Sequence, residues 1–277
     1  MDNADELWVC HLGHLPYPDG LAMQGTLRAR RQAGELPDVL LLLEHPPTYT
    51  LGRRSGAADL PLGADFYRAK GIDVIATDRG GKLTYHGPGQ LVGYPIMAIE
   101  DIGRYLRTME DAIIAALAEQ GIAARSRAGE GIDYTGVWVA ERKIASIGVH
   151  VSRSITTHGF AVNVANDLEP FSWVVPCGLP EVQMTSLAAE WTPADPQHAD
   201  YDSAAPDSAI PVAPKAPGIA CFRKELAYRF CQAHGRRQRL VSARRLGIDT
   251  AHAESGAPTG AQPIKTIAAV TRQAVPA

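Results

Sequence analysis

The stretch from 79 to 90, RGGKLTYHGPGQ, constrains this chain more than any other part of its sequence. Its four glycines and one proline lie between two alternating apolar runs, 72–76 and 91–96, which predict half-buried strands. Glycines at this density allow positive φ angles and let the backbone approach a ligand closely. Cationic and aromatic side chains are interleaved with them, and the Asp, Asn and Ser of ordinary turns are absent. The stretch therefore predicts a binding loop, with a long solvated hairpin turn as the alternative.

Size and composition indicate a globular protein of one large domain or two small ones. The chain has 277 residues, 45% of them apolar, and a net charge of −3, which gives no reason to expect nucleic acid as a partner. No apolar run approaches the roughly 18–20 residues of a membrane span, and the acidic N-terminus is unlike a secretory signal. Four cysteines do not make a disulfide framework. We therefore expect a soluble cytoplasmic protein with free thiols and no membrane contact.

Apolar periodicity predicts the regular elements. Strands are expected over 7–12, 39–43, 136–140, 144–151 and 160–164, and helices over 20–32 (capped by Asp19), 102–119 and 221–234. The unbroken run 39–43 is typical of a central strand covered on both faces. The helix at 102–119 is interpreted as scaffold that carries no chemistry. Residues 141–143 predict a hairpin turn, and a lysine at its end, Lys143, is by residue type alone a solvated surface side chain.

Composition also predicts the domain organisation. Residues 189–218 are rich in Pro, Ala, Asp and Ser, and are expected to form a flexible insertion because they cannot bury enough apolar surface. The tail from 244 to 277 is rich in Ala, Gly, Thr and Pro and is expected to be disordered. A single catalytic domain is then formed by residues 1–188 together with 219–243.

The sequence offers few candidates for chemistry. It contains no phosphate-binding loop, no dinucleotide motif and no serine-nucleophile elbow, and its nine histidines lack zinc-like spacing. Cys177 is a potential nucleophile on an irregular loop, and Lys143, His45, His86 and His158 could modulate it. A loop thiol is reactive only when its thiolate is populated, which a nearby ammonium favours. Residue types alone leave an inert loop thiol open, and a structural histidine at position 45 fits as well as a functional one.

A series of motifs resembles the lipoyl (octanoyl) transferases. The motifs are Glu44-His45-Pro46, the 79–90 stretch with Tyr94, Lys143 to Gly148, Thr156 to Asn163, Pro176-Cys177-Gly178 and Thr185 to Leu187. The similarity extends from about residue 12 to 187 and includes the final helix. It implies an α+β fold in which a mixed β-sheet is packed by flanking helices on one side, as in the catalytic domain of biotin and lipoate protein ligases.

The resemblance also assigns roles to individual residues. It implies that Cys177 is the nucleophile that forms an acyl thioester and that Lys143 lowers the pKa of its thiol. The same resemblance assigns the acyl pocket to Arg79, Gly80, Gly81, Lys82, Leu83, Thr84, Tyr85, His86, Ser146, Ile147, Gly148, Gly159, Phe160 and Ala161, with His45 and His158 in support.

The implied activity is transfer of an octanoyl group from acyl carrier protein to a lysine of lipoyl domains, in protein lipoylation and lipoate biosynthesis. The group would arrive on the carrier's phosphopantetheine arm, and the acceptors would be lipoyl domains of 2-oxoacid dehydrogenases and the glycine cleavage H protein. Thioester-to-amide transfer is downhill, so neither ATP nor another cofactor is expected. The alternatives are an ATP-dependent lipoate or biotin protein ligase, a non-catalytic acyl-carrier binding module, and a cysteine hydrolase that releases octanoate.

Overall fold

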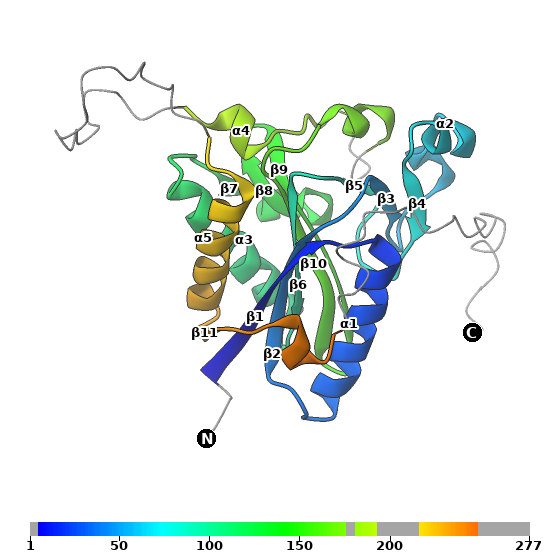
Figure 1. Cartoon of the computed structure of the whole chain (residues 1–277). Coiled ribbons are helices and arrows are strands. Elements are labelled where there is room, and N and C mark those ends of the chain that lie inside the picture. Colours follow the sequence, from blue (N-terminus) through cyan, green and yellow to red (C-terminus); the bar gives the residue numbers. More distant parts are fainter. Residues whose placement is uncertain (1–4, 176–180, 193–215, 249–277) are drawn as a thin grey trace, which may run out of the picture.

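The computed structural model describes residues 5–175, 181–192 and 216–248. These residues form an eight-stranded mixed sheet with strand order β11-β1-β2-β6-β10-β9-β8-β7, and a three-stranded sheet with order β4-β3-β5 (Figure 1). The strands are β1 (Glu6–His14), β2 (Asp38–Glu44), β3 (Thr48–Leu51), β4 (Asp73–Ala76), β5 (Thr84–His86), β6 (Gln90–Ile96), β7 (Arg125–Ser126), β8 (Gly136–Val139), β9 (Arg142–Ser152), β10 (Ile155–Asn163) and β11 (Arg237–Leu240). The helices are α1 (Tyr17–Gln32), α2 (Ala64–Ala69), α3 (Ile102–Ala118), α4 (Leu187–Glu190) and α5 (Ile219–Ala233), and the 3₁₀ turns include η4 (Ile132–Tyr134) and η8 (Ala243–Leu246).

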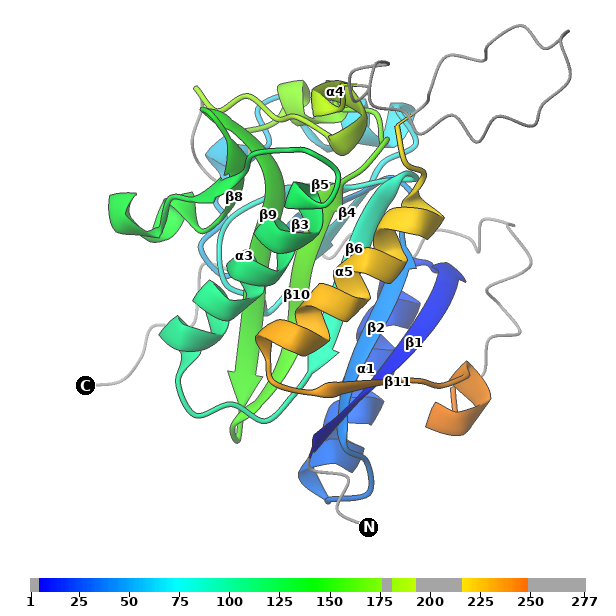
Figure 2. The same cartoon turned by 90° about the vertical axis from the view of Figure 1, so that its left-hand side faces the viewer.

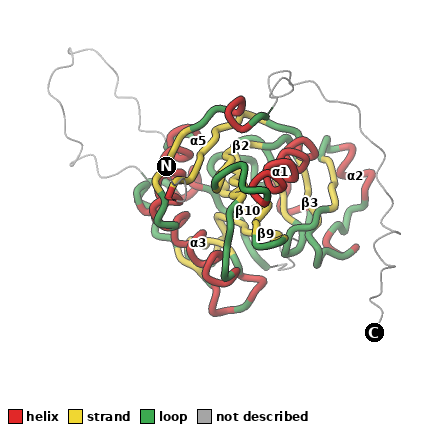
Figure 3. The backbone as a smooth tube through the Cα atoms, turned by 90° about the horizontal axis from the view of Figure 1, so that it is seen from below, coloured by secondary structure: helices red, strands yellow, loops and turns green. Residues whose placement is uncertain are grey.

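Strand β2 is interior and covered on both faces, as predicted. It pairs in parallel with β1 and antiparallel with β6. Leu40 and Leu42 face the core that contains α3 and α5, whereas Leu41 and Leu43 face a second core that contains Leu27 of α1. Helices therefore cover both faces of the sheet (Figures 2 and 3). The prediction of helices on one side is wrong, because a strand that is apolar at every position needs a packing partner on each face.

The helix ends follow local capping signals. Helix α3 begins after Asp101, whose side chain accepts a hydrogen bond from the first turn, and Gly121 follows its end with a φ of +76°. Helix α1 begins at Tyr17, ahead of the predicted start, and has Pro18 in its first turn. Asp19 therefore lies inside the helix and is not its cap. Proline suits a first turn because its missing N–H would have no partner there.

The regular structure crosses both predicted domain boundaries. Helix α4 begins before the predicted insertion at 189–218 and ends within it. The η8 turn crosses the predicted start of the tail at 244, and its Leu246 is 1% exposed against the core on the α1 side. The rest of the predicted insertion and tail, 193–215 and 249–277, lies outside the described residues. None of the helices described is long and apolar enough to cross a lipid bilayer.

The three-stranded sheet attaches the glycine-rich stretch to the large sheet. Strand β3 pairs in parallel with β4 and antiparallel with β5, so the predicted binding loop contains a short strand. The Gly80 N–H donates to the Val149 carbonyl of β9 at 2.9 Å. A third apolar cluster supports this sheet, formed by Tyr49, Tyr67, Ile72, Leu83, Tyr85, Phe171 and Val174. The glycine-rich stretch is consequently held against β9.

Candidate active site

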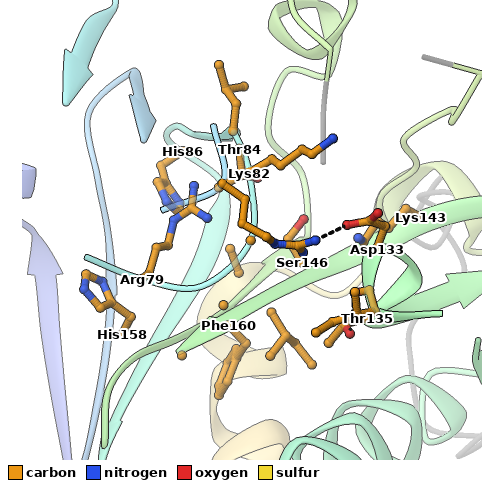
Figure 4. Close-up of a pocket in the computed structure, with 18 of the residues that line it drawn as sticks. Arg79, Lys82, Thr84, His86, Asp133, Thr135, Lys143, Ser146, His158 and Phe160 are labelled. Atoms are coloured by element: carbon orange, nitrogen blue, oxygen red, sulfur yellow. Dashed lines mark hydrogen bonds and ion pairs between the residues drawn. The ribbon is translucent and has the colours of Figure 1, made fainter. Parts of the chain in front are cut away.

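A cavity lies where the small sheet meets β9 and β10 of the large sheet (Figure 4). Its space is about 580 Å³, including its open mouth. Twelve of the residues predicted for the acyl pocket line it, namely Arg79, Gly81, Lys82, Leu83, Thr84, His86, Ser146, Ile147, Gly148, Gly159, Phe160 and Ala161. Lys143 and His158 line it as well. The fold thus brings together motifs that are far apart in the sequence.

Two residues predicted for the pocket lie elsewhere. The Gly80 N–H donates a hydrogen bond to the Val149 carbonyl, and Gly80 does not line the cavity. Tyr85 is 4% exposed and points into the third apolar cluster. Its ring centroid is 5.5 Å from that of Tyr49 and 5.4 Å from that of Phe171. The reason is strand alternation: Thr84 and His86 face the cavity, so the side chain between them must face away.

His45 lies behind the cavity wall and does not contact the cavity itself. It is wholly buried, and its Nδ1 is 2.5 Å from the Leu15 carbonyl oxygen. Because a carbonyl can only accept, Nδ1 carries the proton, and Nε2 accepts from the Tyr94 hydroxyl at 2.6 Å. Burial lowers the pKa of this imidazole to about 4. His45 therefore holds Tyr94, which does line the cavity.

Lys143 is buried, and its interpretation as a solvated turn residue is wrong. It is 1% exposed and lies within β9, because the turn from β8 consists of Ala140 and Glu141. The β8–β9 register shifts between Val137 and Trp138, and such a bulge changes which side chains share a face. Lys143 and Ser146 can therefore both line the cavity although three positions separate them.

A hydrogen-bond network fixes the wall formed by the glycine-rich stretch. Arg79 donates to Thr50 Oγ1 from Nε at 3.2 Å and from Nη2 at 2.9 Å, and Thr50 Oγ1 is 3.4 Å from His86 Nε2. His86 Nδ1 donates to Gln90 Oε1 at 2.8 Å, and Gln90 Nε2 donates to Asn163 Oδ1 at 3.0 Å. All five side chains are buried. Their mutual hydrogen bonds fix the wall before any ligand arrives.

The network ends at the backbone of Lys143. Asn163 Nδ2 donates to the Thr185 carbonyl at 2.9 Å, and the Thr185 N–H donates to the Lys143 carbonyl at 3.0 Å. The Lys143 N–H in turn donates to the Gln183 carbonyl at 2.9 Å. The predicted nucleophile, Cys177, lies outside the described residues, six positions before Gln183 in the sequence.

The inner wall of the cavity combines the Arg79 guanidinium with phenol and imidazole groups whose pKa values are shifted by burial. Burial raises the pKa of Tyr17 to about 12 and lowers the pKa of His86 well below its usual value. Burial also lowers the pKa of His158, whose Nε2 is 2.7 Å from Asp78 Oδ1. Figure 4 shows Arg79 between these two histidines. Beside these polar groups the lining contains the apolar side chains of Leu83, Ile147 and Phe160, which suit the hydrocarbon part of a ligand.

Sequence reasoning did not identify several residues that line the cavity. They are Tyr17, Arg54, Tyr94, Ile132, Asp133 and Thr135. Arg54 Nη1 and Asp133 Oδ1 form an ion pair of 2.8 Å, drawn dashed in Figure 4, which links the segment after β3 to η4. Of this group only Tyr94 lies in a resembling motif. The others come from segments without a local pattern, so no sequence signal marked them.

The three described cysteines are poor candidates for a nucleophile at this cavity. Cys10 and Cys231 are buried, and burial raises the pKa of their thiols to about 11 and about 12. Cys221 is exposed on α5 and does not line the cavity. Within the described part of the chain, no group of three or more His, Cys, Asp or Glu side chains could hold a metal ion.

Sequence comparison identifies close relatives of this chain. A family model described as the lipoyl protein ligase A/B catalytic domain matches residues 16–204, which include every residue that lines the cavity. An octanoyltransferase of Solibacter usitatus is 50% identical over 182 residues, which cover 64% of this chain and 80% of that protein. An octanoyltransferase of Chloroflexus aggregans is 45% identical over 198 residues, which cover 69% of this chain and 87% of that protein.

Comparison of structures shows the fold. Lipoate-protein ligase A bound with ATP superposes with a TM-score of 0.63 at 17% identity, covering 86% of this chain and 89% of that one. The bipartite lipoate protein ligase of Thermoplasma acidophilum gives a TM-score of 0.63 at 17% identity, covering 86% and 87%. The predicted α+β fold, a mixed sheet with flanking helices like that of the lipoate ligases, is confirmed.

Proposed function

Because this chain belongs to the octanoyltransferases of the lipoyl protein ligase A/B catalytic domain family, we propose that it moves an octanoyl group from acyl carrier protein to a lysine of a lipoyl domain. The observation that carries this proposal is the position of Lys143. Lysine is almost never fully buried unless it is paired, and this one is 1% exposed where it lines the cavity beside the glycine-rich wall. The apolar lining residues Leu83, Ile147 and Phe160 suit an octanoyl chain.

In the first step, we propose that the Cys177 thiolate attacks the carbonyl carbon of the octanoyl thioester. A new C–S bond forms, the C–S bond to the carrier breaks, and the carrier leaves as a thiol after taking a proton from the Lys143 ammonium. Before attack, that ammonium would stabilise the thiolate by Coulomb attraction. Residues 183–185 pair with the Lys143 backbone and begin six positions after Cys177 in the sequence, which supports assigning these two residues to one step.

In the second step, the ε-amine of the acceptor lysine attacks the octanoyl-enzyme. A C–N bond forms, the C–S bond to Cys177 breaks, and Lys143, now a neutral amine, accepts the proton that the acceptor amine loses. The cycle ends with the thiolate and the ammonium restored. Dividing the transfer in this way lets two large partners react in turn at one cavity.

The proposal extends to partners, cofactors and location. The donor is octanoyl-acyl carrier protein, which presents the acyl group on its phosphopantetheine arm, and the acceptors are lipoyl domains of 2-oxoacid dehydrogenases and the glycine cleavage H protein. A thioester donor needs no ATP, so we propose that the reaction uses no cofactor. We place it in the cytoplasm, and the unpaired thiols of Cys10 and Cys231 support a reducing compartment.

Mass spectrometry of the intact protein tests the assignment. Incubation with octanoyl-acyl carrier protein, without ATP, is expected to add one octanoyl group to the wild type and none to Cys177→Ser. Transfer to a lipoyl domain should fall about 10²–10⁴-fold in Lys143→Met, as for loss of a general acid–base. The matched controls are Cys221→Ser and Lys224→Met, which change exposed residues of α5 and should keep wild-type rates.

Three outcomes would overturn the proposal. An adduct that persists in Cys177→Ser would place the nucleophile elsewhere. A transfer that requires ATP and free octanoate would indicate a ligase. Release of free octanoate in the presence of a lipoyl domain would indicate a hydrolase.

A further inference from the structure

The geometry points to Glu110 of α3 as a positioning residue for Lys143, acting through Gly136 of β8. This inference rests on the catalytic role proposed for Lys143. Glu110 is 0% exposed, on a helix whose apolar periodicity otherwise predicts only scaffold. A buried carboxylate is costly unless hydrogen bonds compensate its lost hydration, so the contacts of Glu110 indicate what it does.

Gly136 forms part of the space that holds the end of the Lys143 side chain. A Cβ added to Gly136 would lie 2.7 Å from Lys143 Cε and 3.4 Å from Nζ. The φ of Gly136 is +137°, which residues with a side chain rarely adopt. The Trp138 ring centroid lies 5.2 Å from Lys143 Nζ, within the range of a cation–π contact. Any displacement of Gly136 would therefore change the space available to the amine.

Glu110 fixes Gly136 from the α3 side of the sheet. Its Oε1 accepts a hydrogen bond from the Gly136 N–H at 2.8 Å. Its Oε2 accepts a hydrogen bond from the Ser126 hydroxyl and lies 3.0 Å from Arg107 Nη1. One oxygen therefore anchors the carboxylate to β7 and α3, and the other holds the first residue of β8. The Glu110 carboxylate thus connects α3 to the Gly136 backbone, against which the Lys143 side chain packs.

Neither Glu110 nor Gly136 lines the cavity. A change at Glu110 should therefore leave substrate binding intact and act on the reaction only through the position of the amine. Displacements of about 1 Å in a reacting group can cost about 100-fold in rate. This inference consequently predicts a lower kcat at unchanged KM, with kcat counted per folded molecule from the circular dichroism of each variant, so that a loss of stability does not contribute.

The test compares two variants of nearly equal size in steady-state octanoyl transfer. Glu110→Met removes both oxygens and should lower kcat about 10- to 100-fold, with KM within about twofold of the wild type. Glu110→Gln keeps an oxygen that can accept from the Gly136 N–H, and should restore kcat to within about threefold. Ser126→Ala is the matched control, because it removes a hydrogen bond of the same carboxylate but leaves the bond to Gly136. Because the Arg107 contact to the same oxygen remains, the kcat of this variant should stay close to that of the wild type.

The outcomes separate this inference from the proposed function. If Lys143→Met keeps its activity, the proposed function fails. If Lys143→Met is inactive and folded Glu110→Met keeps wild-type kcat, only the positioning role is wrong. It is also wrong if Ser126→Ala loses as much kcat as Glu110→Met, since the effect would then be general. Should Glu110→Met fail to fold, Glu110→Asp, which withdraws the carboxylate from Gly136 by one methylene, must show the same fall in kcat.

Discussion

The buried imidazole of His45 makes the stability of this protein sensitive to mild acid. Its hydrogen bonds to Leu15 and Tyr94 fix the neutral form, and burial lowers its pKa from 6.5 to about 4. Between these two values the unfolded chain binds a proton at this position and the folded chain does not. Protonation therefore favours unfolding. The stability is complete above pH 6.5, falls as the pH drops through this window, and levels off below about pH 4.

The size of the effect follows from the two pKa values. One pKa unit corresponds to about 1.4 kcal/mol. The difference between the two pKa values of His45 therefore corresponds to about 3 kcal/mol in the free energy of unfolding. Between pH 6.5 and pH 5 the loss is about 2 kcal/mol, in a range where most carboxyl groups are still ionised. Burial also lowers the pKa of His86 and His158. Protonation of these two residues also favours unfolding, so they add to the loss of wild-type stability as the pH falls.

Urea unfolding between pH 7 and pH 5 isolates the contribution of His45. The variant His45→Gln keeps a polar side chain but cannot take up a proton, so its free energy of unfolding should fall by about 2 kcal/mol less than that of the wild type over this range. Parallel curves for wild type and His45→Gln would refute the argument, since the imidazole would then titrate alike in both states.

Two further substitutions test the packing around the cavity. Thr50→Val removes the hydroxyl that accepts from Arg79 and should cost about 1–3 kcal/mol in the free energy of unfolding. The KM for the octanoyl donor should rise. An unchanged urea midpoint would contradict the stabilising role of this hydrogen-bond network. Gly93→Ala would place a Cβ 2.0 Å from Phe160 Cζ and should cost about 1–3 kcal/mol by overpacking. The control Gly25→Ala lies in α1 with no atom within 4 Å and should not lower the melting temperature. Equal melting temperatures for both alanine variants would refute the packing argument.

Features encoded in a short stretch of sequence could be predicted correctly. The unbroken apolarity of residues 39–43 predicts an interior strand, and β2 is interior. The period of the run at 102–119 predicts α3 almost to the residue. The glycine-rich stretch predicts a binding wall because positive φ and close approach are local properties of the backbone. The resemblance extended this wall to β9 and β10.

Features that depend on distant contacts could not be predicted. Tyr17 and Thr50 reach the cavity or its wall only because α1 and β3 pack against the glycine-rich stretch. Leu246 is buried on the face of the large sheet that α1 covers. The sequence did not indicate on which face of the sheet this helix lies. In each case the deciding partner is remote in sequence, and no local pattern records it.

Lys143 shows most clearly that the fold, and not the local sequence, determines where a side chain lies. A lysine at the end of a polar turn is expected to extend into water, and the hairpin pattern predicts this exposed position for Lys143. The turn instead consists of Ala140 and Glu141, so Lys143 lies within β9, and a carboxylate on α3 holds the neighbouring backbone at Gly136. The lipoate ligases share this fold at 17% identity, so the sheet alone does not determine the chemistry. We propose that in this chain the chemistry depends on a few buried polar groups, and their perturbation should then change rates more than it changes the fold.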